Sequence, residues 1–185
     1  HIGTTSRCSI LSFNGNKIIT TGMGGAILFK NKNDLINIKH LISTARISHN
    51  WKVEHDKIGY NLRMANINAA LGDSQMNRIK TTIRNKKTLF KKYEDVFNND
   101  EYCFLHKSNI ENQSNHWITN LYLKKKYKKY HQALIKKLHK EKILVRELWK
   151  PQHLNIMYKN MPKSSMTNAI NHWKTGISLP SSNYK

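Results

Sequence analysis

Two short β-prone runs on either side of a glycine-rich turn constrain the fold of this chain more than any other feature. The runs cover residues 8–13 and 26–29, and the turn at residues 20–25 contains three glycines. Glycine adopts backbone angles that are closed to other residues, so a turn of this composition can bend sharply. We therefore expect two short strands joined by a loop with an unusual backbone.

Helical patterns follow these two runs. In the first pattern, Asn33 or Asp34 can cap a helix. The apolar face of that helix consists of Leu35, Ile38, Leu41, Ile42 and Ala45. A longer pattern begins near Met64, keeps apolar residues at helix spacing, and ends at the polar residues 98–100. The order strand, loop, strand, helix indicates an α/β layer.

The last part of the chain alternates again after a polar segment. Residues 106–114 are polar enough to form a linker, so we place a domain boundary there, with domains at 1–105 and 106–185. The pattern beyond it predicts strands near 117–123 and 143–145, with a helix at about 130–142 between them. A loop at 149–153 follows the second strand.

The chain is strongly basic, with 32 Lys and Arg against 11 Asp and Glu, for a formal net charge of +21. Such a field attracts polyanions, so a basic module that binds nucleic acid or another anion is one alternative function. However, only six of the cations are Arg, and the lysines are spread over nearly the whole chain. We therefore expect no specific nucleic-acid partner.

Several other classes of protein are disfavoured. No apolar run approaches the roughly 18 residues that cross a bilayer, so we expect a soluble, cytoplasmic protein. Cys8 and Cys103 are far apart and form no Cys-x-x-Cys pair, which favours two reduced thiols. The ten histidines show no metal-ligand spacing, so we expect no metal site.

Lys17 is the one candidate for covalent chemistry. We expect it at the end of a strand, with a hydroxyl residue, Ser12, before it and the glycine turn after it. An amine in such a place can bond to a phosphorylated aldehyde cofactor, while a hydroxyl and backbone N–H groups hold the phosphate. A surface lysine beside a tight turn is also commonplace, so these residues alone favour a structural role.

The segment at residues 12–25 resembles the cofactor-lysine motif of the DegT/DnrJ/StrS sugar aminotransferases, in which S-F-x-x-x-K is followed by T-T-G-x-G-G. Four further blocks are similar to this family: H-D-x-I-G-Y-N-x-R at 55–63, N-I-x-A-A-x-G-x-x-Q at 66–75, R-x-L-W-x-P-x-H at 146–153, and L-P-S-S at 179–182. These blocks are in order and cover nearly the whole chain, which makes a chance match improbable.

The resemblance implies an α/β fold that is the C-terminal part of a pyridoxal-phosphate-dependent transferase of fold type I. Residues 1–105 would be the end of the large cofactor-binding domain, and 106–185 a truncated small α+β domain. In this family the acidic partner of the cofactor's ring nitrogen, the stacked aromatic ring and the first phosphate loop precede the lysine. We therefore expect a C-terminal fragment that is inactive alone.

The resemblance also implies roles for individual residues. Lys17 would be catalytic, holding pyridoxal 5′-phosphate covalently and then moving a proton. Ser12 would bind the cofactor phosphate, and Asn61 would bind it from a neighbouring subunit, which implies a homodimer with shared active sites. The residues expected to bind substrate are Arg63, Trp149 and His153. For these three, a salt bridge or loop packing is an equally good interpretation.

The implied reaction is transfer of an amino group from glutamate to a nucleoside-diphosphate 4-keto-6-deoxy sugar. Similarity at residues 59–61 and 148–151 to enzymes of bacillosamine- or legionaminic-type sugars favours a UDP-linked acetamido ketosugar. Related dehydratases have His in place of the lysine, so Lys17 favours transamination. The chain departs from the family pattern at residues 6–9 and at Met23. The alternative within the family is a remnant without activity.

Overall fold

The computed structural model describes residues 3–108 and 114–182. The chain divides into two compact units, His1–Lys80 and Thr81–Lys185. This division precedes the predicted domain boundary in the polar segment 106–114, and residues 109–113 of that segment lie outside the described residues. The assignment of 1–105 and 106–185 to the two domains of a whole enzyme stays a prediction.

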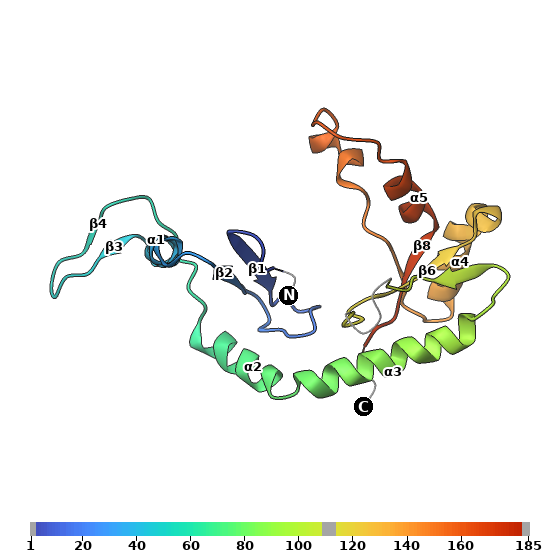
Figure 1. Ribbon diagram of the computed structural model, residues 1–185, viewed down its shortest axis with the longest axis horizontal. Helices are drawn as coiled ribbons and strands as arrows, with labels where there is room; N and C mark the ends of the chain where they lie inside the picture. The colour runs from blue at the N-terminus through green and yellow to red at the C-terminus, as the bar shows by residue number, and fades with distance from the viewer. Residues whose placement is uncertain (1–2, 109–113, 183–185) are drawn as a thin grey trace. The chain divides into compact units, whose positions relative to one another are not determined.

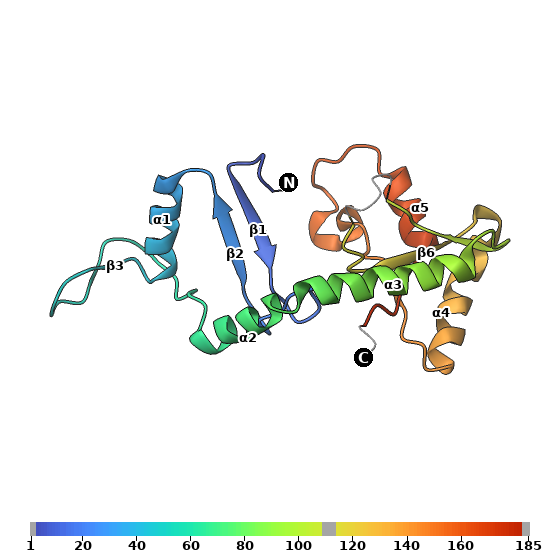
Figure 2. The same ribbon diagram turned by 60° about the horizontal axis from the view of Figure 1, so that its bottom comes forward.

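The first unit is built on a β-hairpin. Strands β1 (Cys8–Ser12) and β2 (Gly25–Phe29) pair antiparallel, with Ile10 opposite Ile27, and Figure 2 shows them as adjacent arrows. Both predicted strands are therefore confirmed. Helix α1 (Lys32–Ile42) follows, and then the short antiparallel pair β3 (Arg46–Ile47) and β4 (Glu54–His55).

Helix α1 confirms the first helical pattern up to Ile42, but Ala45, with a φ of 51°, lies beyond its end, and its predicted cap is wrong. Asn31 is the N-cap, and its Oδ1 accepts a hydrogen bond of 2.8 Å from the backbone N–H of Asn33. Asp34 lies inside the first turn, where its carboxylate accepts hydrogen bonds of 2.7 and 2.5 Å from the guanidinium of Arg7. This bond from Arg7 lowers the pKa of Asp34.

The long helical pattern consists of two helices, α2 (Asn66–Met76) and α3 (Ile79–Phe97), and not of one (Figure 1). The break lies at Asn77 and Arg78, whose backbone N–H groups bond to the carbonyls of Asp73 and Gln75. Apolar residues keep helical spacing across the break, so periodicity alone does not show it. Helix α3 ends before Asn99, which has a φ of 61°, as the polar residues 98–100 predict.

The second unit contains an antiparallel sheet in the order β5-β6-β8-β7. Its strands are β5 (Cys103–Leu105), β6 (Thr119–Leu123), β7 (Arg146–Glu147) and β8 (Gly176–Leu179). The connecting helices are α4 (His131–Lys140) and α5 (Thr167–Thr175), with 3₁₀ turns η1 (Lys125–Tyr130), η2 (Gln152–Leu154) and η3 (Ile156–Tyr158).

The predicted strand at 143–145 is wrong, because pairing with β8 begins only at Arg146. The chain leaves α4 through Lys142, which has a φ of 62°, and the N–H of Ile143 bonds back to the carbonyl of Leu138. The apolar residues that suggested a strand differ in burial: Val145 is buried, whereas Leu144 is 74% exposed.

The apolar core lies in the second unit. Seven buried residues form it: Cys103, Leu105, Leu121, Leu123, Val145, Ile177 and Leu179. Side chains of α3 and α4 pack against this cluster, among them Tyr93, Phe97 and Leu134. Among the described residues of the first unit, only Thr21 and Ala45 are buried. None of the helices in the described ranges has the length and apolar composition to cross a membrane.

Candidate functional site

Lys17 lies in the loop between β1 and β2, and a network of backbone bonds fixes this loop. At its base, the N–H of Phe13 donates to the carbonyl of Gly24 at 3.0 Å, and the N–H of Thr21 donates to the carbonyl of Phe13 at 3.0 Å. Within the loop, the N–H of Lys17 donates to the carbonyl of Asn14 at 2.9 Å. Lys17 is half-buried. The hairpin thus holds the amine-bearing residue at a defined position.

Thr21 joins the lysine loop to helix α2. It is only 2% exposed, and its carbonyl accepts a hydrogen bond of 2.6 Å from Nδ2 of Asn68. A Cβ on Gly72 would lie 2.8 Å from Cγ2 of Thr21, so the helix can approach this closely only with glycine there. Two of the blocks that resemble the family, 12–25 and 66–75, therefore contact one another.

Ser12 ends β1 and is exposed. Its Oγ accepts a long hydrogen bond, 3.5 Å, from the backbone N–H of Asn14. A hydroxyl with so weak an internal bond is available to donate to a ligand. Ser12 and Lys17 thus belong to the same hairpin, one at the end of the strand and the other in the loop.

Asn61 and Arg63 follow a segment that pairs with the end of α1. The N–H of Tyr60 donates to the carbonyl of Leu41 at 2.7 Å, and Ser43 and Asn61 form an antiparallel bridge. Gly59 makes this approach possible, because a Cβ there would lie 2.3 Å from the carbonyl carbon of Thr44. Gly59 therefore allows the close backbone approach that positions Asn61.

A cavity of about 570 Å³ lies beside this bridge. Its lining includes the two predicted residues Asn61 and Arg63, together with Arg46, His49 and Ser43. Two of the six arginines of the chain thus meet in one pocket, and no carboxylate is among its lining residues. Hydroxyl, amide and guanidinium donors without a competing acid form a pocket that suits an oxyanion such as a phosphate.

Arg46 and His49 line the pocket although no motif in the sequence indicates them. They precede Asn61 by more than ten residues, and the Ser43–Asn61 bridge brings the two segments together. The scarcity of arginine in a lysine-rich chain was the one signal that could have pointed to Arg46.

Two histidine contacts hold the β3–β4 hairpin against the end of α1. Nε2 of His40 lies 2.6 Å from Oδ1 of Asp56, and this bond lowers the pKa of Asp56. Nδ1 of His55 lies 2.8 Å from the carbonyl oxygen of Thr44. These contacts fix both ends of the segment that contains Arg46 and His49.

The remaining predicted residues, Trp149 and His153, belong to the second unit. The Trp149 side chain is 72% exposed, and its ring centroid lies 5.8 Å from that of Trp117. Both ring nitrogens of His153, in η2, are shielded from solvent and have no hydrogen-bond partner among the described residues. A shielded polar group without a partner is costly, so this imidazole is suited to meet a polar ligand.

The six predicted site residues therefore lie in three places. Ser12 and Lys17 share the hairpin, and Asn61 and Arg63 share the cavity, whose lining does not include the hairpin residues. Trp149 and His153 share the loop of the second unit, from Trp149 to η2. Their roles stay predictions.

Comparison with known proteins gives a consistent answer over almost the whole chain. A putative pyridoxal phosphate-dependent aminotransferase, EpsN of Bacillus subtilis, is 31% identical over 97% of this chain and 46% of its own length. GDP-perosamine synthase of Vibrio cholerae is 28% identical over 97% of the chain and 49% of that protein. The chain thus spans about half the length of the curated relatives it matches.

Solved structures show the same fold. PseC of Helicobacter pylori, an aminotransferase involved in the biosynthesis of pseudoaminic acid, matches with a TM-score of 0.90 at 23% identity, over 97% of this chain and 49% of that one. The PLP form of the putative sugar aminotransferase Spr1654 of Streptococcus pneumoniae matches with a TM-score of 0.83 at 22% identity, over 97% and 48%. The expected α/β fold, the C-terminal part of a fold found in such transferases, is confirmed. Residues 1–184 match the sequence pattern of one family, and the chain belongs to it: the DegT/DnrJ/EryC1/StrS aminotransferase family.

Proposed function

We propose that the whole protein of which this chain forms a part is a nucleotide-sugar aminotransferase. The family is pyridoxal-phosphate-dependent. The observation that supports the proposal most directly is the position of Lys17, in a hairpin loop fixed by backbone bonds and by the contact of Thr21 with α2. A lysine amine held in place in this way can bond to an aldehyde and later move a proton.

The residues of this chain fit the cofactor. Lys17 would hold its aldehyde carbon through Nζ, and the hydroxyl of Ser12 would donate to its phosphate. The cavity of Arg46, Asn61 and Arg63 offers donors without a carboxylate, which suits a phosphate group. When bound, pyridoxal phosphate supplies an electron-withdrawing ring that stabilises negative charge at the reacting carbon.

Lys17 then has a second task. When its Nζ is not bonded to the cofactor, this lysine amine would accept a proton from the substrate carbon and deliver it to the cofactor carbon. The backbone bond from Lys17 to Asn14 keeps the start of this side chain fixed, so that only the side chain itself has to move. Loss of the amine should therefore abolish turnover.

Asn61 reaches the cofactor phosphate, in this proposal, from a neighbouring copy of the chain. Its place in a cavity that does not contain Ser12 or Lys17 supports such sharing, because the two groups can then meet across two subunits. The proposed assembly is a homodimer with two shared active sites.

The proposed substrates are glutamate, as amino donor, and a nucleoside-diphosphate 4-keto-6-deoxy sugar, as acceptor. Relatives include a GDP-perosamine synthase and a UDP-4-amino-4,6-dideoxy-N-acetyl-β-L-altrosamine transaminase. We favour a UDP-linked acetamido sugar. Arg63 would bind its anionic part, the exposed ring of Trp149 would stack on a planar group, and His153 would meet a polar group of the substrate.

A transamination assay tests this function. The full-length protein, loaded with cofactor, is incubated with glutamate and a UDP-4-keto-6-deoxy acetamido sugar, and formation of the amino sugar is followed by mass spectrometry. We expect the wild type and Lys32→Ala, which removes another lysine of the first unit, to form product. Lys17→Ala should form none. Equal product from Lys17→Ala would refute the proposed role.

The 185-residue chain alone should be inactive. It spans about half the length of its curated relatives, and large apolar side chains such as Ile10, Trp51 and Ile58 are more than three-quarters exposed. Such surfaces in a soluble fold need a covering partner. A remnant without activity is the alternative, and the same assay on the full-length protein distinguishes it.

A further inference from the structure

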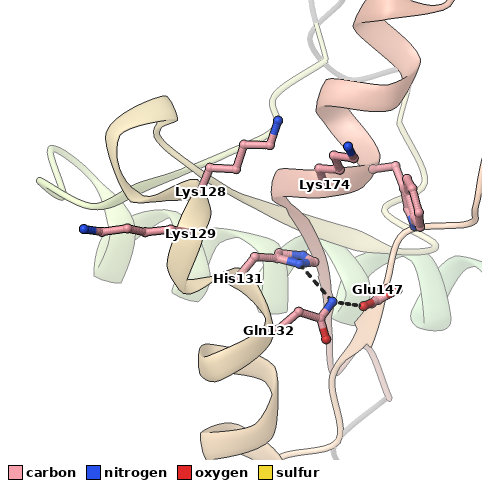
Figure 3. A pocket seen from close by; sticks show the side chains of 7 residues that line it. Lys128, Lys129, His131, Gln132, Glu147 and Lys174 are labelled. Atoms are coloured by element: carbon pink, nitrogen blue, oxygen red, sulfur yellow. Dashed lines mark hydrogen bonds between the residues drawn. The ribbon is translucent and has the colours of Figure 1, made fainter.

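A second cavity, of about 330 Å³, lies within the second unit and has no part in the proposed transamination. Figure 3 shows it between the end of η1, the start of α4, strand β7 and the end of α5. Its volume is in the range of ligand pockets that hold a small molecule. Three features of its lining point to the same class of ligand.

The first feature is a polar clamp at the base of the pocket. Nε2 of Gln132 donates a short hydrogen bond to Oε1 of Glu147 and lies 3.5 Å from Nδ1 of His131 (Figure 3). Nε2 of the buried His131 lies 2.9 Å from the carbonyl oxygen of Gly176, which can only accept, so this nitrogen donates. Both amide hydrogens of Gln132 are thus used, and the clamp fixes Glu147.

The second feature is a pair of lysines. Lys128 and Lys174 line the cavity, and their ammonium groups point to the same side of it in Figure 3. Neither forms an ion pair with a carboxylate of the described residues. The third lysine of the lining, Lys129, points away from the pocket and lies over the ring of Tyr130, 5.1 Å from its centroid.

The third feature is the wall of the pocket. Trp173 is half-buried and lines the cavity, so part of the indole is available to a ligand. Glu147 has a second oxygen, Oε2, that accepts no hydrogen bond from the described residues. A planar aromatic wall, a carboxylate acceptor and two ammonium groups correspond to the ring, the sugar hydroxyls and the phosphate of a nucleotide.

We propose that this pocket binds a nucleoside monophosphate as a small ligand, separately from the substrate site. The phosphate is bound by Lys128 and Lys174, the ribose hydroxyls donate to Oε2 of Glu147, and the base packs on Trp173. A lysine-rich composition alone does not explain why two lysines line the same pocket as a tryptophan and a glutamate.

Lysine footprinting on the full-length, cofactor-loaded protein tests the proposal with AMP as the probe. Free amines are acetylated briefly with and without AMP, and each lysine is quantified by peptide mass spectrometry. We expect AMP to slow acetylation of Lys128 and Lys174 at least about threefold. Lys125 and Lys136, exposed neighbours that do not line the cavity, should react at an unchanged rate. The readout is local, so it does not depend on transamination.

Three outcomes would overturn the proposal. Equal protection of the control lysines would show non-specific screening of charge. Equal protection by inorganic phosphate would show a simple anion, and equal protection by adenosine would show that the lysines bind no phosphate. As a second measurement, the double variant Lys128→Ala/Lys174→Ala should weaken AMP binding at least about tenfold, whereas Lys125→Ala/Lys136→Ala should not. Unchanged AMP affinity in the first variant would also contradict the proposal.

Discussion

The two units of this chain differ in how they are stabilised. The second unit buries seven core residues under α3 and α4, whereas the first unit buries only Thr21 and Ala45 among its described residues. Yet the first unit contains the lysine loop and the cavity with two arginines. The part with the proposed chemistry is thus the part with the smaller core.

This difference indicates what stabilises the first unit. A two-stranded sheet is marginal in water, and β1–β2 exposes Ile10 and Leu28. Hydrogen bonds and close backbone contacts, and not apolar burial, define its local geometry. Since the chain spans about half the length of its relatives, we expect further protein to cover these side chains.

The largest expected effect is in the sheet of the second unit. Ile177 is fully buried, so Ile177→Ala should lower the free energy of unfolding by about 2–5 kcal/mol. Ile58 is 85% exposed, so Ile58→Ala in the 185-residue chain should change the free energy of unfolding by less than about 0.5 kcal/mol. Hydrogen exchange at β6 and β8 measures the first effect. Equal losses in the two variants would remove the contrast between the units.

The next effect concerns backbone packing in the first unit. A Cβ at Gly59 would lie 2.3 and 2.4 Å from backbone atoms of Thr44 and Ala45, whereas one at Gly15 would meet nothing closer than 3.9 Å. Gly59→Ala should therefore cost about 2 kcal/mol, and Gly15→Ala less than about 0.5 kcal/mol. Amide exchange of Tyr60 and Leu62 reports the change. Unaltered protection in Gly59→Ala would show that this approach is not required.

A third prediction separates function from stability. Asn61 is exposed, so Asn61→Ala should leave the unfolding free energy within about 0.5 kcal/mol of the wild type. In the full-length protein it should weaken cofactor binding about tenfold, or about 1.4 kcal/mol, because a phosphate donor is lost. Equilibrium dialysis measures the affinity. An unchanged affinity would contradict a role for Asn61 at the phosphate.

The smallest effect is a pH dependence of the second unit. Oδ1 of Asp100 accepts hydrogen bonds from the Cys103 thiol and from the backbone N–H groups of Cys103 and Tyr102, and these bonds lower the pKa of Asp100. The carboxylate therefore adds stability above the usual aspartate pKa of about 4. That stability is lost as the pH falls through the lowered pKa.

Because Asp100 is only half-buried and solvent screens its charge, we expect this contribution to stay below about 1 kcal/mol. Denaturation midpoints at pH 7 and pH 3 should differ less in Asp100→Asn than in the wild type. Asp95→Asn, a change on the exposed face of α3, should leave the wild-type difference intact. The same pH dependence in wild type and Asp100→Asn would show that Asp100 is not its source.

Elements that depend on local residue patterns could be predicted from the sequence. Strands β1 and β2 were found from their residue types, whereas Lys17, expected at the end of a strand, lies in the loop after β1. The break at Asn77 was missed because apolar spacing continues through it. The strand at 143–145 was wrong because Val145 enters the core from an irregular segment.

Non-local pairing explains the rest. Arg46 and Arg63 share a cavity because the Ser43–Asn61 bridge joins two segments, and no local pattern indicates that bridge. The shielded ring of His153 likewise depends on packing of the loop, which residue types alone do not reveal.

The most direct test of the central claim is to locate the covalent attachment of the cofactor. The full-length protein, loaded with pyridoxal 5′-phosphate, is reduced with borohydride, digested and analysed by tandem mass spectrometry. We predict a phosphopyridoxyl group on the Nζ of Lys17 and on no other lysine. A label on a different lysine, or an unlabelled Lys17 in a protein that retains its cofactor, would contradict the account.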